Sequence, residues 1–320
     1  MVNVACVGAG YWGKNLIRNF NSLGVLHTIC DGEPDVLTKF SEQYPDVKVN
    51  QNFDDVLSDP EVDAVSIATP AETHHALIIK ALEAKKHVYV EKPLCLDEGH
   101  AKECIELANR KGLTLMVGHL LWYHPMVLEI KRAITQGELG ELRYIYSNRL
   151  NMGLLRNEEN VLWSFAPHDI SMILGLVGEK PRSVQAHSAN HLNPSIADQA
   201  VGLLKFPNNV SAHVFVSWLN PFKEQKLVIV GEKAMFVFDD TLLWEQKLAK
   251  YEHSVEWQGE RPVAQKADAE YIVLDQAEPL RDECQHFLDC IDSKEPPRTN
   301  GEEGLAVLEV LNKLQQAMDA

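Results

Sequence analysis

The turn after the first predicted strand restricts the fold of this chain more than any other feature. Residues 2–7 are an apolar, β-branched run without helical periodicity, which is typical of a buried parallel strand. Gly8, Gly10 and Gly13 follow with the spacing G-x-G-x-x-G. In this pattern the first glycine allows a tight turn, the second lets the backbone approach a pyrophosphate, and the third lets the next helix pack against the strand. The sequence therefore predicts a strand, a turn and a helix that bind a dinucleotide.

The residues after this turn agree with a dinucleotide site. Gly24 suits the position just after a helix, and four apolar residues recur at helical spacing before it, namely Leu16, Ile17, Phe20 and Leu23. A second apolar run, residues 26–30, ends in Asp31, where an acidic side chain can accept hydrogen bonds from the adenosine ribose. No Arg or Lys lies between Asp31 and Thr38 to pair with a 2′-phosphate. We therefore expect NAD rather than NADP.

Helices and strands alternate along the first 120 residues, and this order predicts a doubly wound parallel sheet. Its later strands are predicted at 62–68, 86–91 and 113–118. After a helix predicted over 125–136, strands follow one another without helices and so are expected to pair antiparallel, at 142–151, 183–189, 200–206, 210–218, 225–230 and 234–238. Further helices are predicted at 167–177, 280–291 and 302–318. We expect an α/β protein with a Rossmann domain over residues 1–120 and a second α/β domain over 121–320, the last helix being a candidate to pack back on the first.

Composition and charge argue against several other classes of protein. The formal net charge is -16 and no stripe of Lys or Arg offsets it, so binding to nucleic acid or to an anionic membrane surface is not expected. No apolar run approaches the roughly 20 residues of a membrane span, and no basic and apolar leader precedes the first strand. These features predict a cytoplasmic protein.

No metal site is expected from the cysteines and histidines. The six cysteines lack C-x-x-C spacing, and Cys6 and Cys30 fall in predicted core strands. Among the 13 histidines, His74 with His75 and His119 with His124 lie near each other, without an acidic or thiol partner at ligand spacing. Solvated or hydrogen-bonded histidines are the expected outcome.

A lysine follows the strand predicted over 86–91, in the sequence Glu91-Lys92-Pro93. Ligands of doubly wound sheets bind beyond the carboxyl ends of the strands, so Lys92 is expected at the ligand crevice, over the nicotinamide. The alternative is a solvated lysine at a strand end.

The chain resembles the glucose-fructose oxidoreductase, inositol dehydrogenase and rhizopine-catabolism (Gfo/Idh/MocA) family over its whole length. The matching motifs, in order, are Gly8 to Gly13, Asp31, Ala68-Thr69-Pro70 followed by His74, Glu91-Lys92-Pro93, Gly118-His119 with Pro125 six residues on, and His168. The resemblance implies hydride transfer between a carbohydrate hydroxyl carbon and NAD(P), and a C-terminal domain with a large open, mostly antiparallel sheet that commonly forms the oligomer interface. The residues expected to contact the cofactor are Gly8, Gly10, Tyr11, Trp12, Gly13, Asp31, Thr69, Pro70, His74, Glu91, Lys92 and His119.

Lys92 and His168 are the expected catalytic residues. Oxidation of a secondary alcohol needs a base for the hydroxyl proton, a positive group beside the developing alkoxide and a hydride acceptor over the carbon. A lysine near another cation, or partly removed from water, transfers a proton more readily near neutral pH. Because Pro167 fits the start of a helix, His168 could instead cap that helix or lie in the core.

Ser164 departs from the family's pattern, since many members carry an aspartate four residues before this histidine. A neutral hydroxyl cannot stabilise an imidazolium as a carboxylate does, so an Asp-Lys-His arrangement is in doubt. Asp169 is expected to face elsewhere on the helix, where it either binds sugar hydroxyls or stabilises the helix N-terminus.

Two arginines suggest the substrate class. Arg149 and Arg156 flank residues 150–153, and paired guanidinium groups suit a diphosphate, with surface salt bridges as the alternative. With residues 10–16 and 163–171, they resemble most the family branch that oxidises carbon 3 of UDP-N-acetylglucosamine, upstream of a transaminase in lipid A or surface-polysaccharide biosynthesis. The residues expected to contact the substrate are Lys92, Tyr123, Arg149, Arg156, Ser164, His168 and Asp169.

Three alternatives remain open for the function. A relative could oxidise UDP-N-acetylglucosaminuronate, with Arg156 or His191 as the additional cation. Another could reduce a nucleotide-linked keto-deoxy sugar. The chain could also be a dinucleotide sensor without turnover, although Lys92 and His168 argue against this. A homodimer or homotetramer formed through the C-terminal sheet is expected in each case from the resemblance.

Overall fold

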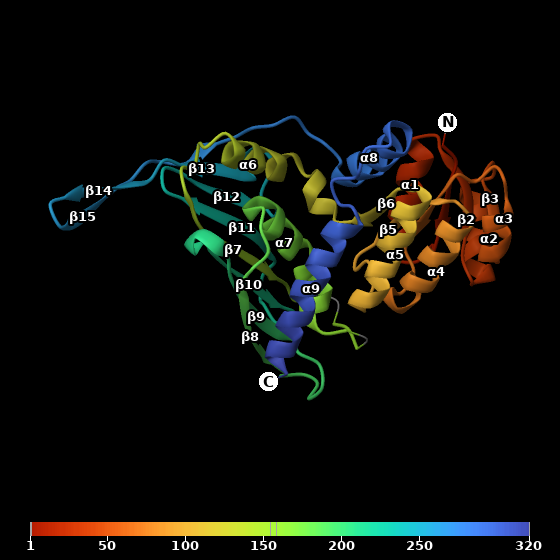
Figure 1. Cartoon of the computed structure of the whole chain (residues 1–320), viewed down its shortest axis with the longest axis horizontal. Helices are drawn as coiled ribbons and strands as arrows, with labels where there is room; N and C mark the ends of the chain where they lie inside the picture. The colour runs from red at the N-terminus through yellow and green to blue at the C-terminus, as the bar shows by residue number, and fades with distance from the viewer. Residues whose placement is uncertain (1, 154, 158, 320) are drawn as a thin grey trace. The chain divides into compact units, whose positions relative to one another are not determined.

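The computed structural model describes residues 2–319 except residues 154 and 158, and the chain divides into two compact units. The first unit comprises the residues up to 123 together with 278–308, and the second comprises 124–277 and the residues from 309 onwards. The chain thus returns to the first unit at Glu278, whereas the prediction gave residues 121–320 to the second domain and named only the last helix as a candidate to pack back on the first. Figure 1 labels most of the helices and strands of both units.

The first unit contains a six-stranded parallel sheet with the strand order β3-β2-β1-β4-β5-β6, which confirms the predicted Rossmann fold. The strands are β1 (Val4–Val7), β2 (Leu26–Cys30), β3 (Lys48–Asn50), β4 (Ala64–Ile67), β5 (His87–Glu91) and β6 (Leu115–Gly118). The helices between them are α1 (Gly13–Ser22), α2 (Pro34–Gln43), α3 (Phe53–Ser58), α4 (Ala71–Glu83) and α5 (Glu98–Lys111), followed by the 3-10 helix η1 (Leu120–Tyr123). The strand order reverses between β1 and β4, so the ligand crevice of such sheets lies beyond the carboxyl ends of these strands.

Two later helices complete the first unit. Helix α8 (Pro279–Ser293) packs against α1 and η1. Helix α9 (Gly301–Met318) begins in the first unit and ends in the second. A Cβ atom on Gly304 would lie 2.7 Å from Val117 Cγ2, so this glycine lets α9 approach β6 closely.

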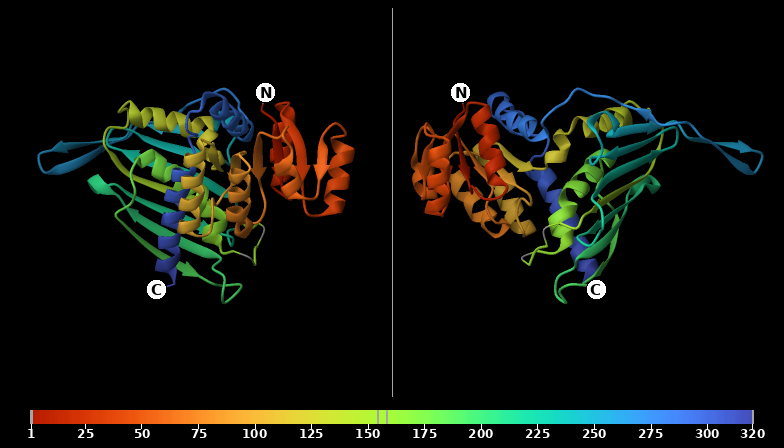
Figure 2. Two further views of the ribbon diagram at one scale, coloured as in Figure 1. Left: turned by 45° about the vertical axis from the view of Figure 1, so that its right-hand side comes forward. Right: turned by 180° about the vertical axis from the view of Figure 1, so that it is seen from behind.

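The second unit contains an eight-stranded sheet with the order β16-β13-β12-β11-β7-β10-β9-β8. Strands β7 and β10 pair parallel and all other neighbours pair antiparallel, which confirms the predicted mostly antiparallel sheet. The strands are β7 (Leu142–Leu150), β8 (Ser183–Ala189), β9 (Gln199–Lys205), β10 (Ser211–Ser217), β11 (Glu224–Gly231), β12 (Met235–Asp239), β13 (Leu248–Tyr251) and β16 (Glu270–Tyr271). A separate hairpin, β14 (Ser254–Gln258) with β15 (Arg261–Gln265), extends away from the sheet (Figure 2).

Helices cover one face of this sheet. Helix α7 (Val161–Val177) packs on β7, β9 and β10, and α6 (Pro125–Thr135) packs on β12. Within the residues described, no helix covers the opposite face, which is visible in Figure 2. No described helix is both long and apolar enough to span a membrane.

Helix α7 begins earlier than the sequence predicted. The prediction placed its start at Pro167, but Asn160 caps the helix by accepting hydrogen bonds from the backbone N–H groups of Leu162 and Trp163. Pro167 lies inside the helix, where a proline removes one backbone N–H donor. His168 is therefore a mid-helix residue and does not cap the helix.

Candidate active site

The glycine-rich turn of the first unit fits a dinucleotide pyrophosphate. Gly8 has a φ of +88°, and a Cβ atom on it would lie 2.6 Å from the Ala68 carbonyl oxygen. A Cβ atom on Gly13 would lie 1.9 Å from the Gly8 carbonyl oxygen. A Cβ atom on Gly10 would meet nothing within 4 Å, so the space outside this residue is open to a ligand. The geometry of the three glycines is thus compatible with the separate roles predicted for them, a close turn, an open approach to a pyrophosphate and close helix packing.

Asp31 fixes the end of β2 beside this turn. Its Oδ2 atom accepts a hydrogen bond from the Ala9 backbone N–H at 2.7 Å, and its Oδ1 atom accepts one from the Glu33 N–H at 2.9 Å. Each carboxylate oxygen keeps acceptor capacity, since a carboxylate can accept about four hydrogen bonds. The geometry is compatible with the predicted acceptance of ribose hydroxyls.

Glu91 connects the glycine-rich turn to the end of β5. Its Oε1 atom accepts a hydrogen bond from Trp12 Nε1 at 2.5 Å, and its Oε2 atom accepts one from the Lys92 backbone N–H at 3.3 Å. Burial raises the pKa of the Glu91 carboxyl group, while the Trp12 hydrogen bond and the Lys92 charge oppose this rise. The peptide bond between Lys92 and Pro93 is cis. The hydrogen bond to Glu91 holds the side chain of Trp12 beside the strand end that carries Lys92.

His74 lies behind the site as a buried support. Its Nδ1 atom lies 2.7 Å from the Pro93 carbonyl oxygen and its Nε2 atom 3.0 Å from that of Thr69. The residue is 1% exposed, and burial lowers the pKa of its imidazole. His74 therefore bridges the segments after β4 and β5. His119 is also buried, with its Nδ1 atom 2.5 Å from Glu303 Oε2.

In the second unit, three of the residues predicted to bind substrate lie on α7, and Arg149 on β7 contacts one of them, Asp169. Ser164 and His168 are four residues apart, so their side chains share one side of the helix. Asp169 is 1% exposed and faces β7, where its carboxylate accepts hydrogen bonds from Ser147 Oγ at 2.5 Å and Arg149 Nε at 2.6 Å. Asp169 therefore neither caps the helix nor faces solvent.

Arg149 and Arg156 both have acidic partners. A second bond, from Arg149 Nη2 to Asp169 Oδ1 at 3.2 Å, makes the Arg149 pair bidentate. Burial lowers the pKa of Arg149, but the Asp169 charge, the hydrogen bonds to Asp169 and the Asp240 charge together raise the pKa overall. Arg156 Nε lies 3.3 Å from Glu159 Oε1, and its side chain is 40% exposed. Sequence reasoning missed the Arg149 pair, although strand alternation already placed Ser147 and Arg149 on one face of β7.

Tyr123 lies inside the first unit. It is 3% exposed, its hydroxyl lies 3.2 Å from Thr299 Oγ1, and the Arg298 guanidinium lies 4.8 Å from its ring centroid. Burial raises the pKa of its phenol. The geometry gives Tyr123 a packing role at the end of the Rossmann domain.

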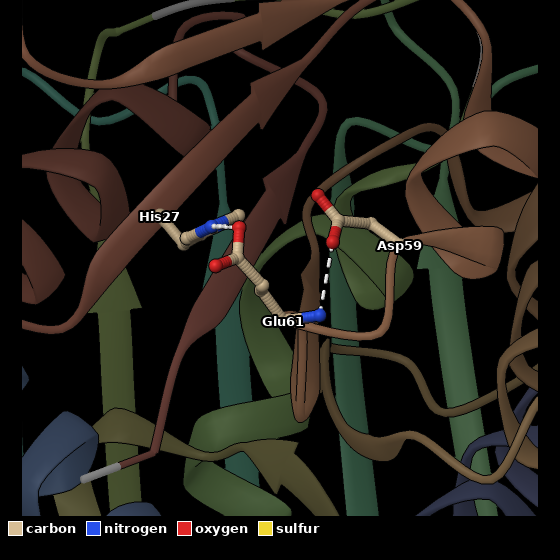
Figure 3. Close-up of side chains that lie close together, drawn as sticks. All are labelled: His27, Asp59 and Glu61. Carbon is tan, nitrogen blue, oxygen red and sulfur yellow. Dashed lines mark hydrogen bonds and ion pairs between the residues drawn. The ribbon is translucent and has the colours of Figure 1, made fainter.

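One group with metal-ligand spacing occurs in the described part of the chain, and sequence spacing did not indicate it. The ligand atoms of His27, Asp59 and Glu61 lie within 4.8 Å of one another (Figure 3). Lys48 Nζ, however, lies 3.1 Å from Asp59 Oδ2 and 2.9 Å from Glu61 Oε2. The Lys48 ammonium group thus already pairs with both carboxylates, and the cluster is an ion-pair network that holds its own cation.

Comparisons with known proteins agree with this architecture. Residues 2–119 match the model of the GFO/IDH/MocA oxidoreductase family with an NAD-binding Rossmann fold, and residues 127–237 match the GFO/IDH/MocA C-terminal domain. The chain is 25% identical over 325 residues to UDP-N-acetylglucosamine 3-dehydrogenase of Acidithiobacillus ferrooxidans, covering 98% of this chain and 96% of the relative. It is 29% identical over 239 residues to scyllo-inositol 2-dehydrogenase (NAD(+)) of Bacillus subtilis, covering 69% and 68%. A solved structure of an oxidoreductase of Magnetospirillum magnetotacticum is 30% identical with a TM-score of 0.84, covering 98% and 99%.

Proposed function

The chain belongs to the GFO/IDH/MocA oxidoreductase family, and from this premise we propose that it oxidises the 3-hydroxyl group of a UDP-N-acetylhexosamine to a ketone. The protein is an NAD-dependent dehydrogenase that acts on a CH–OH group. UDP-N-acetylglucosamine is the preferred substrate of the proposal. The observation that carries it is the relationship to the Acidithiobacillus UDP-N-acetylglucosamine 3-dehydrogenase, which extends over nearly the whole of both chains.

The glycine-rich turn, Asp31 and the Thr69-Pro70 segment would hold the dinucleotide. When bound, NAD⁺ supplies the hydride acceptor. Lys92 lies at the carboxyl end of β5, where a doubly wound sheet places its ligand. In the proposed mechanism Lys92 and His168 share the substrate hydroxyl, one taking its proton while the other stabilises the negative charge that develops on oxygen.

Arg156 is the better of the two arginines for the diphosphate. Its only described partner is Glu159 in an ion pair at 3.3 Å, and such pairs on the surface stabilise by about 0–1 kcal/mol, so a diphosphate could replace it. Arg149 already forms a buried bidentate pair with Asp169, and it would lose this pair if it bound a diphosphate instead. We therefore assign diphosphate binding to Arg156 and the support of α7 to Arg149.

A second copy of this chain is the proposed partner of the uncovered sheet face. Aromatic and apolar side chains lie next to one another there: Tyr146 stacks on His213 with centroids 5.1 Å apart, while Tyr144 and Leu203 are 41% and 43% exposed. Contiguous apolar surface of this kind is typical of protein interfaces. Phe215→Glu, on the same face of β10 as His213, should therefore lower the oligomeric state measured by light scattering.

The relationship to scyllo-inositol 2-dehydrogenase favours a second candidate, oxidation of a cyclic polyol without a nucleotide. A substrate screen separates these possibilities. UDP-N-acetylglucosamine, UDP-N-acetylgalactosamine, UDP-N-acetylglucosaminuronate and scyllo-inositol would each be incubated with NAD⁺, with Lys92→Ala as the control. The proposal requires NADH formation with a UDP-N-acetylhexosamine and a C3 carbonyl in the product by NMR. Turnover of scyllo-inositol alone would replace the proposal with polyol oxidation. A protein that binds NAD but turns over none of these substrates would favour a sensor.

The chemistry of the product indicates which kind of enzyme acts after this one in a biosynthetic pathway. A 3-keto nucleotide sugar is a substrate for a transaminase, so we place the enzyme upstream of such a step in lipid A or surface-polysaccharide biosynthesis. Soluble NAD and nucleotide sugars are the required reactants, which makes the cytoplasm the proposed compartment.

A further inference from the structure

A buried carboxyl group on α8 lies behind the end of β5. Glu283 is 0% exposed, and its Oε2 atom lies 3.0 Å from the Tyr89 hydroxyl oxygen. Its Oε1 atom is buried and has no hydrogen-bond partner among the residues described. A carboxylate without a cation in such an environment carries a large desolvation cost, whereas a neutral carboxylic acid does not.

The groups that face Glu283 do not compensate for a negative charge. They are Tyr89 and Glu91 on β5, Tyr123 on η1, Glu303 on α9 and Cys284 on its own helix, with His119 paired to Glu303. Burial raises the pKa of Glu283 most, the Glu91 charge raises it further, and the Tyr89 hydrogen bond offsets only part of the rise. The result is a pKa well above the ordinary value for glutamate.

The hydrogen atoms in this cluster can be counted. The Tyr89 hydroxyl has a single hydrogen, yet its oxygen lies 3.0 Å from Glu283 Oε2 and 3.3 Å from Glu91 Oε1. If both acids were ionised, two carboxylates would compete for one hydrogen and repel each other. If Glu283 keeps its proton, it can donate to Tyr89, and Tyr89 can donate to Glu91.

We propose that Glu283 is a positioning residue: as a neutral acid it donates to Tyr89, which directs the tyrosine hydrogen to an ionised Glu91. Glu91 then has three donors, the Tyr89 hydroxyl, the Trp12 indole and the Lys92 backbone N–H. These bonds hold the glycine-rich turn beside the catalytic strand end. Gly118 provides the space, because a Cβ atom there would lie 2.7 Å from Tyr89 Oη and 3.0 Å from Glu91 Oε1.

The pH dependence of stability tests whether Glu283 is neutral. An acid whose folded pKa is raised stabilises the fold fully below its unfolded pKa, near 4.5, and this stabilisation is lost as pH rises through the folded pKa. Glu283→Gln keeps a donor and cannot ionise. Its unfolding equilibrium constant, relative to wild type, should therefore fall by about tenfold per pH unit as the pH rises from the unfolded pKa of the glutamate towards its raised folded pKa. A ratio that stays constant over this range would mean that Glu283 is ionised in the folded protein, and the proposal would be wrong.

NADH affinity tests the connection to the cofactor site. Glu283→Gln should bind NADH within about twofold of wild type, whereas Tyr89→Phe and Glu283→Met should each weaken binding by about fivefold, the effect of one hydrogen bond. Because Glu283 acts through Tyr89, adding Glu283→Met to the Tyr89→Phe variant should cause no further loss of NADH affinity. The positioning role of Glu283 would be wrong if the two substitutions lowered NADH affinity additively, or if Tyr89→Phe bound NADH as tightly as wild type. Asp282→Asn, an exposed acid on the same helix, is the matched control. If Glu283→Met does not fold, the Gln and Phe variants still decide the outcome.

Discussion

Arg149 and Asp169 form a bidentate ion pair between β7 and α7, with Nε–Oδ2 and Nη2–Oδ1 distances of 2.6 and 3.2 Å. The side chains are 13% and 2% exposed, so most of the pair is removed from water. Ser147 adds a third hydrogen bond to the same carboxylate. Because His168 precedes Asp169 directly, this pair also holds the backbone that carries the proposed catalytic histidine.

Breaking this pair should destabilise the second unit strongly. Asp169→Ala leaves the Arg149 charge buried without a partner, and such losses cost about 3–5 kcal/mol. Urea unfolding should show this decrease. The double variant Arg149→Met with Asp169→Leu should recover much of it, because no buried charge remains. Equal stability of Asp169→Ala and wild type would mean that the pair contributes nothing.

Arg156 should act on substrate binding. Arg156→Ala should raise the KM for the nucleotide sugar by about ten- to hundredfold with a smaller change in kcat, because a diphosphate contact is made in both the ground and the transition state. Glu159→Gln is the matched control, since it removes the ion-pair partner and keeps the guanidinium group. Unchanged kinetics in Arg156→Ala would assign this arginine to the surface ion pair alone.

Lys92 and His168 should each be needed for turnover. Removal of a positioned acid–base group typically costs about 10²–10⁴ in rate, so Lys92→Ala and His168→Ala should lose most of kcat while they still bind NAD. If both groups act on one proton, the double variant should be little slower than the slower single variant. Steady-state and single-turnover rates measure this, and two independent losses that multiply would contradict the shared role.

Ser164 should contribute little to the same reaction. Ser164→Ala removes a neutral hydroxyl and should lower kcat by less than about tenfold, below the range for an acid–base residue. A loss as large as that of His168→Ala would instead indicate that the serine relays the proton. Ser164→Asp, which restores the family's more usual residue, should then reveal whether a carboxylate at this position changes the pH profile of kcat.

Asp31 should determine the choice between NAD and NADP. Its charge should repel a 2′-phosphate, so Asp31→Asn should narrow the difference between the two dissociation constants and keep an acceptor for the Ala9 N–H. Asp31→Ala should also narrow the difference between the two dissociation constants. It should in addition lower the affinity for both cofactors, because the turn loses the hydrogen bond from the Ala9 N–H. Tighter binding of NADP by wild type would refute the assignment.

The sequence by itself determined the order of elements and the nature of the cofactor site. The glycine spacing, the apolar runs and the acid after the second strand are local patterns, and each depends on residues close together in the chain. They correctly predicted the Rossmann fold, the NAD cofactor and the mostly antiparallel second sheet. The strand β3 and the strands after residue 247 were missed, because strands of two to five residues are too short to show the periodicity on which such predictions depend.

Only the tertiary structure decided the partners of the charged and buried polar residues. Arg149 and Asp169 are 20 positions apart and Tyr89 and Glu283 are 194 apart, so no local pattern relates either pair. Their contacts arise when α7 packs on β7 and when α8 returns to the first unit. Burial then determines what these groups can do, because a charge removed from water needs a partner and an acid without one keeps its proton.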